Sequence, residues 1–164
     1  NVEEAHGNVV VFYEETPRGT FGGMELLREW RGNEPFVLTN GDELKDCNLK
    51  ELQEFHSGHE GVGTIWLTKV SNAHEYGVPI LDGHTITEFL ENPENPPSNF
   101  INSGLYIFDP EVFDYADFSR NEVSIERDIF PRLAREGKLY GHKLEGRWYD
   151  CGNLERWEKA IKEW

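Results

Sequence analysis

The chain has 164 residues, of which 31 are acidic and 16 are basic, so its formal net charge is −15. Such an acidic chain repels the phosphates of DNA and RNA, which excludes extended nucleic-acid binding but leaves room for a small phosphorylated ligand held by a divalent cation or a few local donors. Hydrophobic residues make up 37% of the sequence and aromatic residues 13%, which indicates one folded domain and excludes a disordered acidic tail.

Membrane insertion and secretion are not indicated. No apolar stretch approaches the roughly 20 residues that cross a bilayer, and the amino terminus has no basic-then-apolar signal pattern. Cys47 and Cys151 are the two cysteines and lack CxxC spacing, so neither a disulfide framework nor a zinc site is predicted. We expect a soluble cytoplasmic protein with no membrane partner. Because the chain begins with Asn1 and not Met, we also expect that sequence upstream is missing.

The first half of the chain alternates between strand and helix patterns. Residues 8–13 predict a strand, residues 16–19 a turn, and residues 22–30 a helix with Met24, Leu27 and Trp30 on one face. A short apolar strand at 35–40 and a helix at 49–55 follow. Apolar strands that alternate with amphipathic helices predict an α/β fold, in which a mainly parallel sheet is covered by helices on both faces.

The second half begins with strands. Residues 62–70, 76–81 and 85–90 predict strands, and the turn Asp82-Gly83 joins the last two into an antiparallel insertion. Three prolines make residues 91–99 a surface loop. Further elements follow in order: a strand at 101–108, a helix at 124–136, a strand at 139–144, and a helix at 153–164 with Asn153 as its N-cap. No repeat or linker interrupts the chain, so residues 1–164 form one domain.

Two aspartates lie where α/β proteins bind ligands, beyond the ends of apolar strands. Asn40-Gly41-Asp42 ends one strand, and Asp150 lies in a predicted loop between a strand and a helix. Carboxylates from two distant segments suit a Mg²⁺ ion that is bridged to substrate phosphates. A simple turn at 40–42 and a helix cap at Asp150 are the structural alternatives.

Two histidines close to the predicted 49–55 helix are a weaker candidate. His56 and His59 could share a metal, but Gly58 separates them at the end of the helix. We expect both side chains on the solvated surface.

Five segments, in this order and spacing, resemble a known family. They are residues 36–42 (FVLTNGD), 76–78 (YGV), 101–108 (INSGLYIF), 124–131 (SIERDIFP) and 145–153 (EGRWYDCGN). Together they resemble the sugar-nucleotide pyrophosphorylases, a nucleotidyltransferase family, and are nearest to the mannose-1-phosphate guanylyltransferases. The resemblance implies a Rossmann-like, GT-A-like domain that is truncated at its amino terminus, so that residues 1–164 lack the first strand and the phosphate-binding loop.

The resemblance also implies site residues and ligands. Asp42 and Asp150 would be the catalytic, metal-binding aspartates, with Mg²⁺ as cofactor. Gly77, Asn102 and Glu126 would hold sugar hydroxyls, and Gly19 and Thr20 would lie near the base and ribose. Other implied substrate-binding residues are Asn40, Gly41 and Glu91. The implied partners are a nucleoside triphosphate with a sugar 1-phosphate, or the nucleotide sugar, and assembly into a homo-oligomer is left open.

The sequence departs from the family pattern in three places. No glycine-rich loop with arginine and lysine is present to hold a triphosphate, so we expect the isolated chain to be inactive or a weak catalyst. Glu91-Asn92-Pro93 replaces glutamate-lysine-proline, which removes a charge-assisted phosphate contact worth about 1.5 to 3 kcal/mol. Asn153 replaces a common threonine and can cap a helix equally well.

Three interpretations therefore remain. In the first, the chain is part of an enzyme that converts a sugar 1-phosphate and a nucleoside triphosphate to a nucleotide sugar and pyrophosphate, with GDP-mannose as the first candidate. In the second, it is a non-catalytic binding or regulatory subunit of the same fold, which Asn92 favours. A metal-dependent glycosyltransferase is the third, and the absence of an Asp-x-Asp motif after a strand argues against it.

Overall fold

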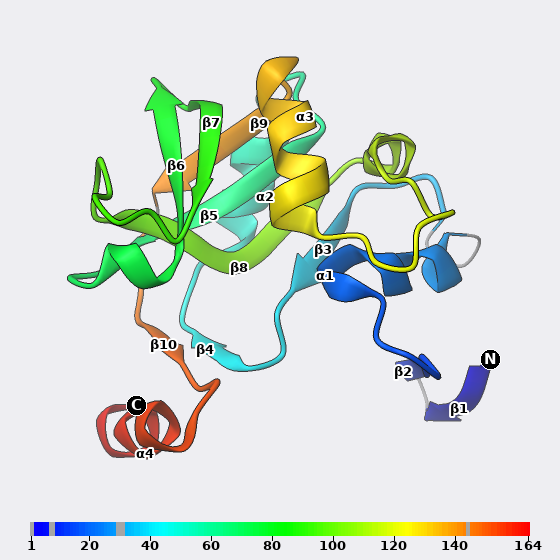
Figure 1. Ribbon diagram of the computed structural model, residues 1–164, viewed down its shortest axis with the longest axis horizontal. Helices are drawn as coiled ribbons and strands as arrows, with labels where there is room; N and C mark the ends of the chain where they lie inside the picture. The colour runs from blue at the N-terminus through cyan, green and yellow to red at the C-terminus, as the bar shows by residue number, and fades with distance from the viewer. Residues whose placement is uncertain (1, 7–8, 29–31, 144) are drawn as a thin grey trace.

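A six-stranded sheet forms the centre of the protein (Figure 1). The computed structural model describes residues 2–6, 9–28, 32–143 and 145–164. The strand order in the sheet is β3-β8-β5-β9-β7-β6. The bounds of these strands are β3 Phe36–Thr39, β5 Gly63–Lys69, β6 Gly77–Asp82, β7 Thr85–Glu91, β8 Phe100–Phe108 and β9 Leu139–Lys143.

The strands of this sheet run in mixed directions. Among the described residues, β5 and β9 form its parallel pairing, whereas β8 is antiparallel to both β3 and β5, and β7 is antiparallel to both β6 and β9. The α/β class and the antiparallel hairpin are confirmed, but the expectation of a mainly parallel sheet is wrong. The reason is that burial on both faces makes a strand apolar whichever way it runs, so the hydrophobic pattern of β8 does not reveal its direction.

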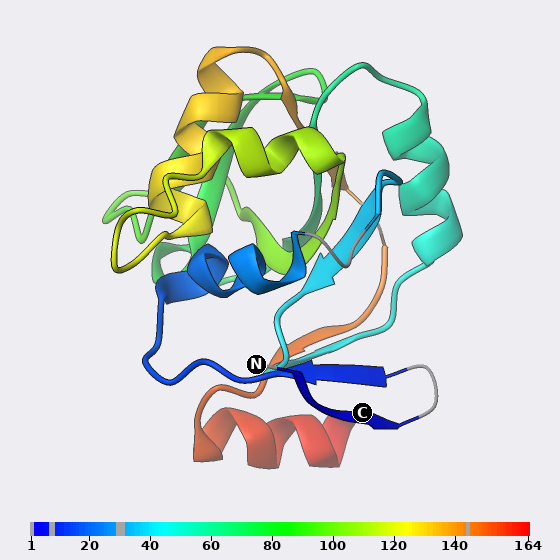
Figure 2. The same cartoon turned by 90° about the vertical axis from the view of Figure 1, so that its right-hand side faces the viewer.

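Helices cover both faces of the sheet (Figures 1 and 2). Successive side chains of β5 point to opposite faces, as the pleat requires. Ile65 and Leu67 pack into the larger hydrophobic cluster, which contains Phe130 of α3, while Trp66 packs with Leu52 of α2 on the other face. The helices are α1 (Gly19–Gly22), α2 (Leu49–Ser57), α3 (Phe130–Arg135, preceded by the π-helical turn Ile125–Ile129) and α4 (Leu154–Glu163).

A smaller structural unit lies below the main sheet in Figure 1. It consists of β4 (Glu43–Lys45), which pairs antiparallel with β10 (Trp148–Asp150), and of α4, which follows β10. Separately, β1 (Val2–His6) pairs antiparallel with β2 (Val9–Phe12). In the described part of the chain, no helix combines the length and the apolar character needed to cross a bilayer.

Most predicted elements are present, with shifted ends. The Asn153 side chain accepts a hydrogen bond from the Arg156 N–H at 3.0 Å and caps α4, as expected. The predicted 22–30 helix begins earlier, as α1, and continues as a 3₁₀ helix over Gly23–Leu27, while Trp30 lies outside the described residues. Residues 8 and 144, at the ends of two predicted strands, also lie outside them.

Several short elements carry no sequence signal and were not predicted. Asp150 is the last residue of β10 and not part of a loop. A strand of three to five residues that contains charged side chains shows too few periods of alternation to be recognised. The unpredicted elements are β1, β4, β10 and the 3₁₀ helices Ala73–Glu75 and Pro110–Tyr115.

The two histidines near the end of α2 belong to a hydrogen-bond chain, so the expectation of two solvated side chains is wrong. His56 is only 5% exposed, and the ring of His59 stacks on Tyr140 with a centroid distance of 3.9 Å. The Gly61 N–H donates to Nδ1 of His59 at 2.9 Å, so neutral His59 carries its proton on Nε2 and donates it to the Thr64 hydroxyl at 2.8 Å. The Thr64 hydroxyl can then donate to Nδ1 of His56, also at 2.8 Å.

This chain of hydrogen bonds requires neutral histidines. Burial and the neighbouring His56 lower the pKa of His59 to about 4 from 6.5, and burial lowers the pKa of His56 against the opposing effect of Asp109. A depressed histidine pKa means that the unfolded chain binds more protons than the native one between the two values. The resulting stability is complete above pH 6.5 and is lost as the pH falls toward 4.

We predict that His59→Phe flattens this pH dependence. Phenylalanine keeps a ring against Tyr140 but has no titrating group, so the free energy of unfolding should fall less between pH 6.5 and 4 than in the unaltered chain. Urea unfolding at several pH values measures the two profiles. His74→Gln, at a side chain that is 59% exposed, is the matched control and should leave the profile unchanged. Parallel profiles for His59→Phe and the unaltered chain would contradict the prediction.

Candidate active site

The pairing of β4 with β10 brings the two predicted aspartates together. Asp150 is opposite Glu43 in the ladder, and the Cys151 N–H donates to the Asp42 carbonyl at 2.9 Å. A Cβ atom placed on Gly152 would lie 3.1 Å from Oδ1 of Asp150 and 3.5 Å from Oδ2 of Asp42. Both carboxylates therefore border the same small space above Gly152, which a side chain at this position would fill.

Asp150 is held by contacts to each of its oxygens. The Gly152 N–H donates to Oδ1 at 2.7 Å, and the Tyr76 hydroxyl donates to Oδ2 at 3.2 Å. Arg156, one turn into α4, forms an ion pair with Oδ2 and a second ion pair with Glu75. Burial and the Asp150 charge raise the pKa of Tyr76, which keeps its hydroxyl protonated as a donor. Oδ1 thus faces Asp42, whereas Oδ2 faces Arg156.

Asn40 and Gly41 precede Asp42 but differ in their surroundings. The Asn40 backbone N–H donates to the Gly104 carbonyl at 2.8 Å, which ties this loop to β8, and its side-chain amide lies 3.5 Å from Glu43. The added Cβ position of Gly41 has no atom within 4 Å and is open to the exterior. Asn40 therefore has a structural partner, while the backbone of Gly41 is accessible.

Glu43 is a buried carboxylate beside this loop. Its Oε2 forms an ion pair with Lys45 at 2.6 Å, and the two side chains are 12% and 8% exposed. Burial raises the pKa of Glu43 despite the opposing effect of Lys45. The ion pair compensates the Glu43 charge locally, so Lys45 is occupied and is not a free cation for a ligand.

Gly19 and Thr20, which the family resemblance puts near the base and ribose, contact the segment that leads into the π-helical turn Ile125–Ile129. Thr20 donates its hydroxyl proton to Oε2 of Glu126 at 2.8 Å and accepts the Ile125 N–H at 2.9 Å. The Ser124 hydroxyl also donates to Oε2 of Glu126 at 2.8 Å. Gly19 has φ of +81°, and a Cβ there would lie 2.7 Å from the Val123 carbonyl oxygen. The loop that contains Gly19 and Thr20 is therefore fixed against Glu126, as a shared site requires.

Gly77 and Glu91 lie together at the open end of the β6–β7 pairing. They are paired across β6 and β7, and a Cβ on Gly77 would lie 2.5 Å from the ring of Phe89 and 3.2 Å from Oε2 of Glu91. Burial, followed by the charge of Glu126, raises the pKa of Glu91. The two carboxylates are thus close enough to influence each other.

Asn102 is bonded mostly within the protein. Its amide oxygen accepts the Gly104 N–H at 3.0 Å, and its amide nitrogen donates to the hydroxyl of buried Tyr106 at 2.9 Å. Burial raises the pKa of Tyr106, and the charges of Glu126, Glu43 and Glu91 raise it further. The Tyr106 hydroxyl therefore lies among the carboxylates of both halves of the site. One N–H of the Asn102 amide remains for a ligand.

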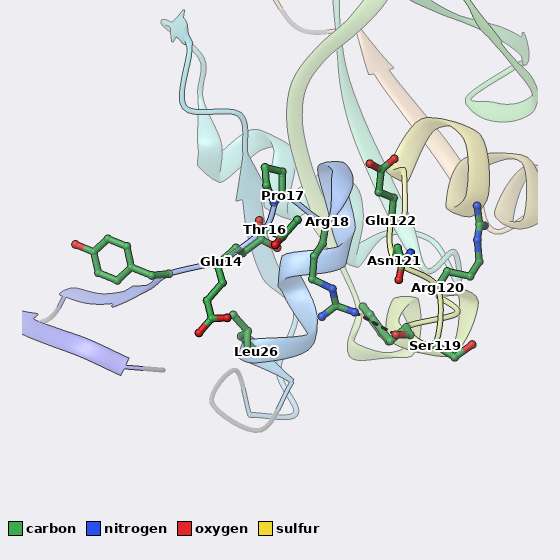
Figure 3. A pocket seen from close by; sticks show the side chains of 12 residues that line it. Glu14, Thr16, Pro17, Arg18, Leu26, Ser119, Arg120, Asn121 and Glu122 are labelled. Atoms are coloured by element: carbon green, nitrogen blue, oxygen red, sulfur yellow. Dashed lines mark hydrogen bonds between the residues drawn. The ribbon is translucent and has the colours of Figure 1, made fainter.

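Asp150 and Gly19 border different cavities. The largest, of about 810 Å³, lies between the 13–18 segment and the 118–122 segment, where Arg18 reaches across to the Phe118 carbonyl (Figure 3). Asp150 borders a cavity of about 350 Å³, and Gly19 one of about 210 Å³. Asp42, Asn102 and Glu126 line neither of these two cavities.

Sequence reasoning missed the residues that position this site, although two of them have a detectable signal. Gly104 interrupts an otherwise bulky strand, and an isolated glycine in a strand indicates close backbone approach. Its φ is +65°, and a Cβ there would overlap Glu43 and lie 2.5 Å from Asn40 Nδ2. Lys45 follows Glu43 by two residues, the spacing of neighbours on one strand face. Arg156 and Tyr106 have no local signal.

The donor set is compatible with a hard divalent cation. Asp42 makes no side-chain hydrogen bond to the described residues, and Oδ1 of Asp150 points to the same space with a lone pair to spare. No cluster of three or more His, Cys, Asp or Glu side chains suited to a metal occurs in the described ranges. Two carboxylates suffice for Mg²⁺ when substrate phosphates and water complete its coordination.

Similar proteins include enzymes of sugar-nucleotide synthesis. The chain is 41% identical over 144 residues to mannose-1-phosphate guanyltransferase beta-A of Xenopus laevis, which covers 85% of this chain and 39% of the relative. It is 40% identical over 156 residues to mannose-1-phosphate guanyltransferase of Saccharomyces cerevisiae, which covers 92% and 43%. The chain spans about two-fifths of the length of these curated relatives.

Solved structures share the fold. A Bacillus anthracis protein assigned as a glucose-1-phosphate thymidylyltransferase and solved with a sucrose has a TM-score of 0.81 at 24% identity, covering 91% of this chain and 62% of its own. A UDP-glucose pyrophosphorylase complexed with UDP-glucose has a TM-score of 0.75 at 24% identity, covering 90% and 62%.

The family itself is shown by the extent of the sequence match. The match to the nucleotidyl transferase family covers residues 2–164 and includes both strands, β4 and β10, that bring the two aspartates together. Together with the guanyltransferase relatives of about 40% identity, it shows that this chain belongs to the nucleotidyl transferase family.

Proposed function

We propose that the protein containing this chain transfers a nucleotidyl group to a sugar 1-phosphate, with GDP-mannose and pyrophosphate as the products. The observation that carries the proposal is the convergence of Asp42 and Asp150 above Gly152 in a chain of this family. The choice of mannose and guanine rests on the relatives named mannose-1-phosphate guanyltransferase. Since those relatives extend well beyond this chain, the activity belongs to the whole protein.

In this proposal, an oxygen of the sugar phosphate attacks the α-phosphorus of the nucleoside triphosphate, and pyrophosphate leaves. Asp42 and Asp150 would hold Mg²⁺, which would neutralise charge on the phosphates. The residues of this chain mainly position the substrates. Glu91 and Glu126 offer acceptors to hexose hydroxyls, and Asn102 offers its remaining N–H. The missing Cβ of Gly77 leaves room for the ring of Phe89 beside Glu91.

A second candidate function is a non-catalytic subunit that binds nucleotide sugars. Asn92 favours it, because this residue supplies no charge where the family resemblance expects a lysine. Asn92 has φ of +46°, a left-handed conformation in which asparagine is favoured among residues with a side chain, and its N–H donates to the Tyr76 carbonyl at 3.2 Å. The local backbone conformation thus favours asparagine over lysine at this position.

We also propose a cytoplasmic location. Cys47 and Cys151 are both free thiols, which suits a reducing compartment.

The proposal predicts a Mg²⁺-dependent stabilisation of this chain by GDP-mannose. Ligand at about 100 times its dissociation constant adds about 2.7 kcal/mol to the free energy of unfolding. Asp42→Asn and Asp150→Asn should each remove most of the Mg²⁺-dependent part, measured as a thermal shift relative to the same variant without ligand. Asp82→Asn, in the exposed β6–β7 turn, is the control and should respond like the unaltered chain.

The results separate the two candidate functions. Stabilisation by GDP-mannose together with pyrophosphate exchange into GTP by the full-length protein supports the transferase. Stabilisation without exchange supports the binding subunit. If no nucleotide sugar or sugar 1-phosphate shifts the unfolding temperature, both are wrong. A response of both aspartate variants equal to that of the control would refute the proposed cation site.

We further predict that Asn92→Lys destabilises the fold. Lysine in the left-handed region should lower the free energy of unfolding by about 1 kcal/mol, because its Cβ and side chain disfavour positive φ more than those of asparagine. Asn92→Gly is the matched control and should be at least as stable as the unaltered chain. Chemical denaturation measures both variants, and equal stability of the lysine and glycine variants would show that the backbone does not select the residue.

A further inference from the structure

A small cavity beside Asp150 gathers positive side chains in an otherwise acidic protein. Its volume is about 350 Å³, at the small end of the range for ligand pockets. It lies between the end of β5, the 70–76 segment, β10 and α4. The polar residues on its wall are Lys69, Ser71, Asn72, Tyr76, Asp150, Arg156 and Lys159.

Three cationic side chains, Lys69, Arg156 and Lys159, line this cavity, against one carboxylate, Asp150. Arg156 is placed by its ion pairs to Asp150 and Glu75 and lies over the Tyr76 ring, with its guanidinium carbon 5.6 Å from the ring centroid. Lys69 and Lys159, by contrast, form no ion pair with any residue of the described ranges. Two exposed ammonium groups therefore face the cavity without a partner, beside an aspartate whose charge is already compensated.

The largest cavity differs in this respect. It contains Arg18 and Arg120, but Arg18 pairs with Glu25 at 2.6 Å and Arg120 pairs with Asp128 at 2.7 Å. The carboxylates of its wall then leave it with negative charge. An anionic ligand is therefore favoured beside Asp150 and disfavoured in the larger cavity.

The backbone connects this cavity to Gly77 and Glu91, two of the residues proposed to lie beside the hexose. Tyr76 borders the cavity, and the next residue, Gly77, is paired with Glu91 across β6 and β7. Asn92 follows Glu91 and donates its N–H to the Tyr76 carbonyl.

We propose that Lys69 and Lys159 bind the phosphate group of the sugar 1-phosphate. This inference rests on the proposed function and adds the residues that receive the phosphate. Oδ2 of Asp150 is paired with Arg156, which also borders this cavity, whereas Oδ1 lies beside Gly152 on the side of Asp42. A phosphate in the cavity would therefore meet Asp150 on the side where Arg156 offsets its charge. The hydroxyl of Ser71 and the amide of Asn72 add uncharged donors.

The test compares two lysines of one helix. Lys159→Met removes a cavity charge, and Lys162→Met removes an exposed α4 charge that does not border the cavity. Lys69→Met and the double variant Lys69→Met/Lys159→Met complete the set. Calorimetric titration with mannose 1-phosphate, mannose and orthophosphate measures affinity, and thermal unfolding without ligand checks that each variant is folded.

We expect each cavity variant to bind mannose 1-phosphate about tenfold more weakly, and the double variant roughly a hundredfold more weakly, as for loss of charge-assisted hydrogen bonds. Affinity for mannose should not change, because it has no phosphate. Lys162→Met should bind like the unaltered chain. Orthophosphate should compete with mannose 1-phosphate in the unaltered chain, and higher salt should weaken both ligands.

The outcomes distinguish this inference from the proposed function. If the unaltered chain binds mannose 1-phosphate and all cavity variants bind it equally well, the phosphate site is wrong while the proposed function stands. Equal weakening by Lys162→Met would also overturn the site, because it would show a general effect of charge. If the unaltered chain binds orthophosphate but no sugar phosphate, the anion site stands and the sugar 1-phosphate assignment is wrong. Binding of none of these ligands overturns both.

Discussion

The three-residue pairing between β4 and β10 is the constraint on which the candidate site depends. It joins the segment after β3 to the segment before α4 and puts Asp150 opposite Glu43, next to Asp42. The bond from the Cys151 N–H to the Asp42 carbonyl extends the pairing by one step. Two bonds to neighbouring residues of β8 support the same arrangement: the Asn40 N–H donates to the Gly104 carbonyl, and the Trp148 ring N–H donates to the Ser103 carbonyl.

The site is built from charges that compensate each other in pairs. Buried Glu43 has Lys45, and Asp150 has Arg156, which also reaches Glu75. Glu91 and Glu126 form no ion pair with any described residue, and the Glu126 charge adds to burial in raising the pKa of Glu91. The arrangement suits a ligand that brings hydroxyl donors to the two glutamates and a phosphate to the side where positive charge remains. This division of the site supports both the proposed substrate class and the assignment of Lys69 and Lys159.

Long periodic segments were predictable, and short ones were not. The strand over Phe100–Phe108 and the helix over Leu49–Ser57 appear near their predicted positions because burial imposes a pattern on many residues in each. The expectation of a mainly parallel sheet was wrong, and β4 and β10 were missed. The two aspartates were singled out by their place beyond the ends of apolar strands and then by the family motifs. The side-chain amides of Asn40 and Asn102 both find partners within the protein.

The sequence by itself determined the α/β class and the order of most elements and indicated the two aspartates that β4 and β10 bring together, because these features are carried by local patterns and by motifs that are contiguous in the chain. The tertiary structure alone decided the mixed direction of the sheet and the buried histidine chain near Thr64. It also decided the pairing of Asp150 with Arg156 and the cavity that contains Lys69 and Lys159. Each of these depends on contacts between residues far apart in sequence, and such contacts form only when separate elements pack together.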